Sequence, residues 1–313
     1  MFSYNDNLRN MKNTCFAIFC FMSGVLFAQQ DPHFTQYFEN TLFVNPAYAG
    51  SRGALNITSV HREQWTGFDG RPQSSTLSIH SPMKNESVGL GLTLVNDAIG
   101  PMNQTMVYGD YSFTLKFSEK SHLALGMKAG VNLINLNTQE LTTNTANDPN
   151  LQSSSNFRVN PNFGFGAYYH SEHFFAGFSI PKLLERSYSD LDDPNRSIEQ
   201  RHYYTILGGV FNLNSSVKLR PTCQVKMTAG APISIDLALT SILNDKFWIG
   251  SMFRYNAAIG FFTQYSVNES LRIGLATDFG IQQIRNFNSG TFEAMISYDF
   301  SFEKNGIRSP RYF

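Results

Sequence analysis

Residues 122–133 of the chain read HLALGMKAGVNL, and apolar side chains alternate there with small or polar ones. The apolar set is Leu123, Leu125, Met127, Ala129, Val131 and Leu133. The other set is His122, Ala124, Gly126, Lys128, Gly130 and Asn132. Because successive side chains of a β-strand point to opposite faces of the sheet, this stretch predicts a strand with one apolar face.

The same period of two recurs after Gly50, between clusters of Gly, Asn, Ser, Asp and Pro. Clear examples lie at residues 88–94, 247–254, 271–278 and 292–300. Their second face holds mostly Gly, Ala, Ser and scattered charges, whereas a soluble sandwich presents many Lys, Glu and Thr to water. A barrel in a lipid bilayer turns its apolar face outward and its small polar face inward, which fits this pattern better.

The composition excludes several other classes of protein. Lys and Arg number 24 and so do Asp and Glu, so the chain lacks the cationic excess with which proteins bind nucleic acids. A hydrophobic content of 42% is too high for a disordered chain. A mean hydropathy of −0.23 argues against a helical membrane bundle. Only 15% of the residues are charged, which is low for a soluble domain.

The N-terminal residues predict export. Lys12 precedes an apolar stretch that ends at Ala28, before the polar Gln29 and Gln30. A basic start, a short apolar core and a small residue at the cleavage position are typical of a signal peptide, here residues 1–28, with Met1 or Met11 as the start. Cys223 is then the one cysteine that remains, so no internal disulfide is expected. Export and alternation together indicate the outer membrane of a Gram-negative bacterium, with its lipid as partner.

Counting the alternating runs predicts an all-β fold, a transmembrane antiparallel β-barrel of about 14 strands. The runs cover residues 53–64, 73–81, 87–96, 104–117, 121–135, 158–170, 173–180, 202–213, 216–227, 232–243, 246–255, 257–267, 270–281 and 290–302. Bacterial barrels have even strand numbers, short periplasmic turns and longer external loops. The count meets this rule, because the two longest connections, near 137–157 and 181–201, both fall on the external side.

Segments outside the barrel complete the predicted organisation. Asp31 and Pro32 resemble a helix start, and apolar residues then follow at helical spacing as far as Asn45. Residues 29–50 are therefore predicted to form a short amphipathic helical segment that packs into the lumen or its periplasmic mouth. A loosely tethered arm is the alternative, since short helices are marginal when isolated. Residues 51–302 would form the barrel, and residues 303–313 a periplasmic tail.

No pattern in the sequence indicates catalysis, a cofactor or a metal. His170, Glu172 and His173 could ligate a metal, but alternate side chains of a strand diverge, and a polar turn is the simpler interpretation. The nucleophile elbow G-x-S-x-G does not occur. A barrel hydrolase assembles its site across strands, so sequence spacing alone does not test for one.

Charged residues on the predicted inner face form a candidate polar network of the lumen. They are Asp236, Arg254, Arg272, Asp278, Glu293 and Asp299. An ion or substrate path is one interpretation, and a salt-bridged interior that closes the lumen is the other. Mixed signs favour closure, because buried charges require partners.

Several short motifs resemble the PorP/SprF family of type IX secretion system membrane proteins of Bacteroidetes. They include FVNPAYAG at 43–50, HREQW at 61–65, FAGFSIP at 175–181, RHYY at 201–204, VKMTAGAP at 225–232, NDKFWIG at 244–250 and SPRYF at 309–313. The signature residues are Asn45, Pro46, Ala47, Tyr48, Gly50, Arg62, Trp65, Gly230, Pro232, Asp245, Lys246 and Trp248. The residues Met227, Thr228 and Ala229 depart from the family's usual aromatic or Val-Pro before the glycine.

The resemblance implies a non-enzymatic outer-membrane component of type IX secretion, which in gliding bacteria supports surface display of adhesins. It also implies two kinds of partner, the secretion machinery and secreted cargo with a C-terminal sorting domain. The long connections near 137–157 and 181–201 are predicted to contact the exported partner. The alternative function is a channel for diffusion or uptake of a small solute.

Overall fold

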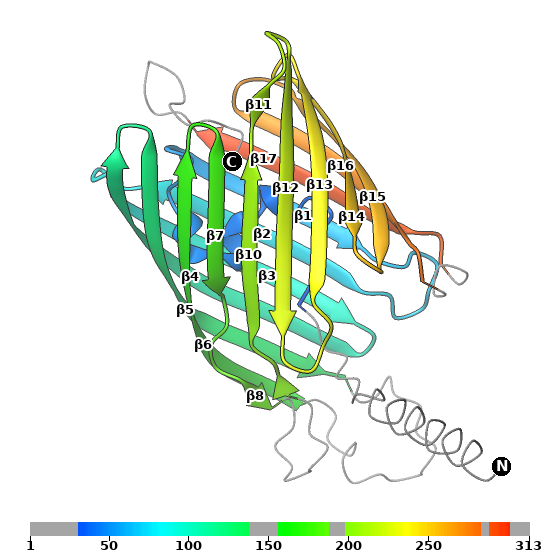
Figure 1. The fold of residues 1–313 in the computed structure, drawn as a ribbon. Helices are drawn as coiled ribbons and strands as arrows, with labels where there is room; N and C mark the ends of the chain where they lie inside the picture. The colour runs from blue at the N-terminus through cyan, green and yellow to red at the C-terminus, as the bar shows by residue number, and fades with distance from the viewer. Residues whose placement is uncertain (1–30, 138–155, 188–197, 283–287, 301–313) are drawn as a thin grey trace, which may run out of the picture.

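The computed structural model describes residues 31–137, 156–187, 198–282 and 288–300, and these form a closed β-barrel. Fourteen strands make its wall, and every neighbouring pair is antiparallel (Figure 1). Each wall strand pairs with the next along the chain, and β1 (Leu55–Glu63) pairs with β17 (Thr291–Phe300) to close the circle. The predicted fold class is therefore confirmed.

The remaining wall strands follow in chain order. They are β2 (Gln73–Pro82), β3 (Val88–Ile99), β4 (Met102–Ser118), β5 (Ser121–Leu136), β6 (Asn156–Ser171), β7 (Phe174–Ile180), β10 (His202–Gly209), β12 (Val217–Thr228), β13 (Ser234–Leu243), β14 (Phe247–Arg254), β15 (Ala258–Ser266) and β16 (Leu271–Gly280). Their ends lie within about three residues of the predicted runs, because the period of two ends where each turn begins.

Two details of the wall differ from the prediction. The run expected at 202–213 is interrupted, and the short β11 (Phe211–Asn212) continues β10 along the same partner, β12. The register sets Gly209 opposite Pro221, which has no N–H to donate to the ladder. The second detail is a small ladder outside the wall, formed by β8 (Arg186–Ser187) and β9 (Ile198–Glu199).

The two faces of the wall separate as the alternation predicts. On β5, Leu125 and Met127 are 49% and 56% exposed, whereas Ala124 and Lys128 on either side of them are buried. Large apolar side chains on most of the other wall strands are exposed in the same way. In a protein from the outer membrane this outer face meets lipid, and the inner face forms the core.

The connections divide the barrel into two ends. At the end that we call the turn end, the links are short, such as 119–120, 172–173 and 244–246. At the opposite end, the loop end, lie the links 64–72, 137–155 and 181–201. Much of 137–155 and part of 181–201 lie outside the described residues, as do the predicted signal peptide and the predicted C-terminal tail.

The N-terminal segment lies inside the barrel, but it is not one amphipathic helix. It contains three short pieces, η1 (Tyr37–Glu39), α2 (Thr41–Val44) and η2 (Pro46–Tyr48). The predicted helix start at Asp31 is wrong because that carboxylate binds side chains of the barrel instead of capping a helix. Nearly every residue from 34 to 49 is buried, so the segment has no solvent face. No helix among the described residues is long and apolar enough to span a membrane.

Candidate functional site

Residues 31–50, which we call the lumen segment, run through the barrel from one end to the other. Asp31 contacts Lys182 and Tyr204 at the loop end. Gly50 lies near the turn end, where its backbone N–H donates to His80 Nδ1 over 3.1 Å. Figure 1 shows this segment in dark blue within the ring of strands. The inner face of the wall, with its small residues, therefore surrounds the lumen segment along the length of that segment.

Glycines of the wall make room for the signature residues 45–50. A Cβ on Gly126 would lie 2.1 Å from the backbone nitrogen of Ala47, and one on Gly89 would lie 2.2 Å from the carbonyl oxygen of Ala49. Gly166 similarly receives the Asn45 side chain, whose Nδ2 donates to the carbonyl of Ala167 over 3.0 Å. The wall and the lumen segment thus meet backbone to backbone, which only glycine allows.

A buried carboxylate, Glu39, lies among three arginines near the turn end. Its oxygens are 2.9, 3.1 and 3.5 Å from nitrogens of Arg272, Arg220 and Arg52. Burial alone would raise the pKa of Glu39, but the three guanidinium groups lower it to about 2. The carboxylate is therefore ionised, and it ties the lumen segment to β12 and β16.

The signature residue Trp248 packs within the same cluster. The guanidinium carbons of Arg220 and Arg272 lie 4.8 and 4.4 Å from its ring centre, and Arg220 also stacks on Phe38 at 4.2 Å. Such cation–π contacts are strong when the groups are shielded from water. Trp248 therefore holds two arginines in place for Glu39.

Arg62 organises a second cluster nearer the loop end. Its guanidinium is 2.7 Å from Asp278 and 3.3 Å from Glu293. Glu293 in turn accepts hydrogen bonds from the backbone N–H groups of Thr35 and Gln36, at 2.8 and 3.0 Å. Glu293 thus binds the backbone of the lumen segment directly, whereas Arg62 and Asp278 bind the hydroxyl of Thr35.

The remaining members of the candidate polar network also lie in the interior. Asp236 binds Arg254 through two hydrogen bonds of 2.9 Å, and Asp299 accepts one of 2.7 Å from Asn56. Of the six residues, only Asp236 and Arg254 bind one another. The other four bind the lumen segment or the arginines at 52 and 62, neither of which belongs to the six.

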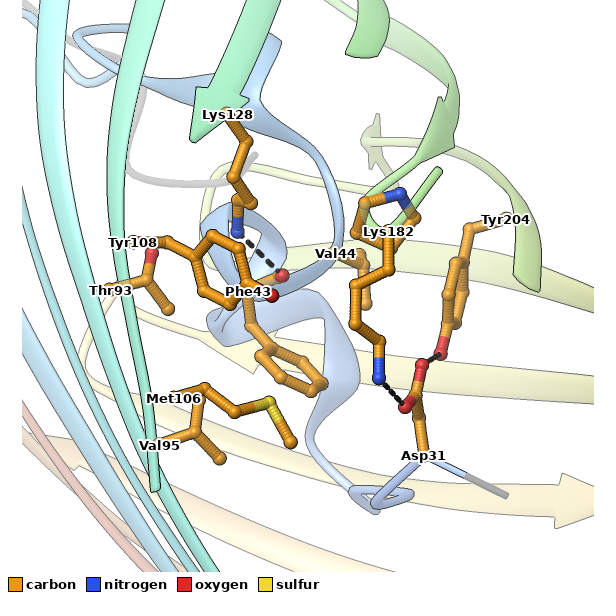
Figure 2. Close-up of a pocket in the computed structure, with 11 residues that line it drawn as sticks. Asp31, Phe43, Val44, Thr93, Val95, Met106, Tyr108, Lys128, Lys182 and Tyr204 are labelled. Carbon is orange, nitrogen blue, oxygen red and sulfur yellow. Dashed lines mark hydrogen bonds and ion pairs between the residues drawn. The ribbon is translucent and has the colours of Figure 1, made fainter. Parts of the chain in front are cut away.

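Lysines from the wall and from the 181–201 connection bind the lumen segment near the loop end (Figure 2). Lys128 Nζ donates to the carbonyls of Leu42 and Phe43 over 3.0 and 2.9 Å, and lies 3.3 Å from Asp110. Lys182 binds Asp31. Between these lysines is a cavity of about 20 Å³, which holds about one water molecule.

Other signature residues lie in the connections. Trp65 adopts a φ of 56° in the 64–72 link, where Thr66 exchanges backbone hydrogen bonds with residues 289 and 290. Gly230 has a φ of 76° in the link that contains Pro232, which lies at the loop end. Asp245 and Lys246 form a turn-end link, and Asp245 binds Lys218 over 2.7 Å. Some signature residues therefore lie in the lumen, and the others lie at the two ends of the barrel.

The candidate network of six residues omits most of the buried charges among the described residues. Arg220 and Lys226 lie on the inner face of β12, and the period of two would have assigned them to the lumen. Asp31, Glu39 and Lys182 lie on irregular segments, where no period predicts the direction of a side chain. Among the described residues, no group of three His, Cys, Asp or Glu side chains is arranged to hold a metal.

Comparison with known protein families identifies the chain. The sequence model described as type IX secretion system membrane protein PorP/SprF matches residues 26–298. The chain belongs to the PorP/SprF family. The resemblance seen in the short motifs is therefore confirmed, and so is the location in the outer membrane. The family and the fold are those of secretion and porin-type membrane proteins rather than of enzymes.

Solved structures share the architecture of this PorP/SprF protein at low sequence identity. The CymD monoaromatic hydrocarbon channel is 11% identical, with a TM-score of 0.51 over 86% of this chain and 93% of that one. A Pseudomonas aeruginosa FadL homologue is 14% identical, with a TM-score of 0.44 over 88% and 96%. At such identity the likeness concerns the fold alone. No curated protein sequence matches the chain.

Proposed function

We propose that this protein is a non-enzymatic component of the type IX secretion system that supports secretion or cell-surface attachment of proteins with a C-terminal sorting domain, such as gliding adhesins. The match of the family model over residues 26–298 carries the proposal. Its partners would be proteins of the secretion machinery and the exported cargo. The proposal takes residues 1–28 as a removed signal peptide and 303–313 as a periplasmic tail, both outside the described residues.

The filled interior supports a docking role over free passage of solutes. The lumen segment has buried residues along its length, and three charge clusters bind it to the wall and to the 181–201 connection. A solute channel of this width needs an open aqueous path, as in porins. Because outer-membrane barrels carry their longer loops outside the cell, the loop end would receive the exported partner.

Deletion of the gene in its host tests the proposal. We expect proteins with a C-terminal sorting domain to disappear from the cell surface and return when the gene is supplied in trans. Proteomics of the surface fraction, with ordinary porins as the control, measures this effect. Unchanged display of every such protein would contradict the proposal.

Conductance separates the proposed role from the alternative of a solute channel. The purified barrel in planar bilayers should be nearly silent, because the lumen segment fills it. A steady, solute-selective current from the wild-type protein would favour the channel instead.

A further inference from the structure

The side chain of Asp31 occupies a site that is built to bind a carboxylate. Lys182 Nζ donates to Oδ1, and the Tyr204 hydroxyl donates to Oδ2 over 3.2 Å. His202 Nδ1 lies 3.3 Å from Oδ2. Figure 2 shows Lys182 and Tyr204 converging on the two oxygens. Both carboxylate oxygens are therefore bound by side chains that the wall and the 181–201 connection supply.

The site is buried and its groups come from separate elements. Lys182 belongs to the connection after β7, whereas His202 and Tyr204 lie on β10. The side chains of Lys182 and His202 are only 7% and 3% exposed, and Tyr204 is 4% exposed. Charge-assisted hydrogen bonds shielded from water are strong and favour one geometry. Burial alone would raise the pKa of Asp31, but His202, Lys182 and Lys226 hold it well below its usual range.

One of the three groups, Lys182, has a partner that does not depend on Asp31. Lys182 also binds Glu199 over 2.6 Å, and Glu199 accepts hydrogen bonds of 3.1 and 3.2 Å from Asn132. If the Asp31 side chain moved out, Glu199 would still hold Lys182 toward the lumen.

We propose that Lys182, His202 and Tyr204 form a binding site for a carboxylate of the exported partner, and that Asp31 occupies this site until the partner displaces it. The ligand class is a peptide segment with an aspartate, a glutamate or a free C-terminus. That the ligand belongs to an exported protein rests on the proposed function. The carboxylate site itself rests on the contacts described above. Displacement would also release the first residues of the lumen segment from the 181–201 connection.

Peptide binding to the purified barrel in detergent tests the proposal. The probes are the acetylated, amidated pentapeptides Gly-Ala-Gly-Ala-Asp and Gly-Ala-Gly-Ala-Asn, which differ in one carboxylate. In the Asp31→Asn and Asp31→Ala variants, we expect the Asp peptide to bind at least about tenfold more tightly than to the wild-type protein, because a tethered competitor acts at an effective concentration of about millimolar. The Asn peptide should not bind.

Further variants make the site assignment specific. Lys182→Met in the Asp31→Asn background should abolish binding of the Asp peptide. Lys218→Met should leave it unchanged, because Lys218 pairs with Asp245 at the turn end. On an SDS gel, each variant should still migrate as an SDS-resistant folded band, which confirms that it is a barrel. Equal binding of the two peptides, or binding that survives Lys182→Met, would overturn the proposal.

Acetate and acetamide test the carboxylate specificity of the site without a peptide. In the Asp31→Ala variant, acetate should raise the unfolding temperature in a saturable way, and acetamide should not. Stabilisation of the wild-type protein to the same extent would show that Asp31 does not compete, which overturns the proposal. This assay needs no secretion machinery, so its failure is separate from a failure of the surface-display experiment.

Discussion

Glu39 carries a charge inside the barrel because three arginines surround its carboxylate. An ion pair of this kind stabilises little against an apolar replacement, but loss of the carboxylate removes the negative charge that the three buried guanidinium groups share. The substitution Glu39→Gln should therefore cost about 3–5 kcal/mol of unfolding free energy. Loss of this one carboxylate would weaken the attachment of the lumen segment to β12 and β16.

The pH dependence of stability tests the same residue. The folded pKa of Glu39 is about 2, against an ordinary value of 4.5, so its contribution is present above pH 4.5 and declines as the pH falls toward 2. Thermal unfolding in detergent should show the gap between wild type and Glu39→Gln narrowing across this window. A gap that stays constant would contradict the ionised state of Glu39.

At the scale of elements, the contact between β5 and η2 depends on the absence of a side chain at Gly126. A Cβ there would meet backbone atoms of Pro46 and Ala47 at 2.1–2.5 Å, and backbone cannot turn aside as a side chain can. Gly126→Ala should therefore displace η2 and cost about 1–3 kcal/mol. Protease sensitivity of the lumen segment, together with the unfolding temperature, measures the effect.

Gly109 on β4 is the matched control for this substitution. A Cβ there would have its nearest neighbour at 3.9 Å, which is ordinary contact. Gly109→Ala should leave both protease resistance and the unfolding temperature near those of the wild type. Equal sensitivity of the two variants would indicate that alanine weakens the strands themselves, not the contact with η2.

At the scale of the whole molecule, the exposed apolar face should define the depth at which the barrel sits in the bilayer. Leu239 lies at the middle of β13 and is 49% exposed, whereas Tyr255 lies beyond the end of β14 and is 57% exposed. Arginine costs about 2–4 kcal/mol at the bilayer midplane and about 0–1 kcal/mol near the interface. Leu239→Arg should therefore destabilise the barrel in lipid vesicles far more than Tyr255→Arg. Equal costs in denaturant titrations would mean that the bilayer lies elsewhere on the barrel.

The strands could be predicted from the sequence because each one carries its own signal. The alternation at 122–133 depends only on neighbouring residues, and it places Lys128 on the inner face without reference to any other strand. The lumen segment carries no such signal. Its Asp31 and Pro32 match a helix start locally, yet the carboxylate binds Lys182, which is 151 residues away in the chain.

Partners across the lumen could not be predicted for the same reason. The period of two places Arg272 on the inner face, but its partner Glu39 lies 233 residues away on an irregular segment. The candidate network therefore contained the correct wall positions without most of the residues that bind them. Gly89 and Gly126 fall on the predicted face of small residues, and the structure shows the backbone atoms of the lumen segment that crowd them.

The sequence by itself determined the strands, their inner and outer faces, the barrel class and the family, because all of these follow from local alternation and short motifs. Only the tertiary structure decided how the lumen is filled. Residues 31–50 are held by charges and glycines from strands throughout the wall, which come together only when the barrel closes. The carboxylate site at Lys182, His202 and Tyr204 exists for that reason as well, since no one segment of the chain contains it together with Asp31.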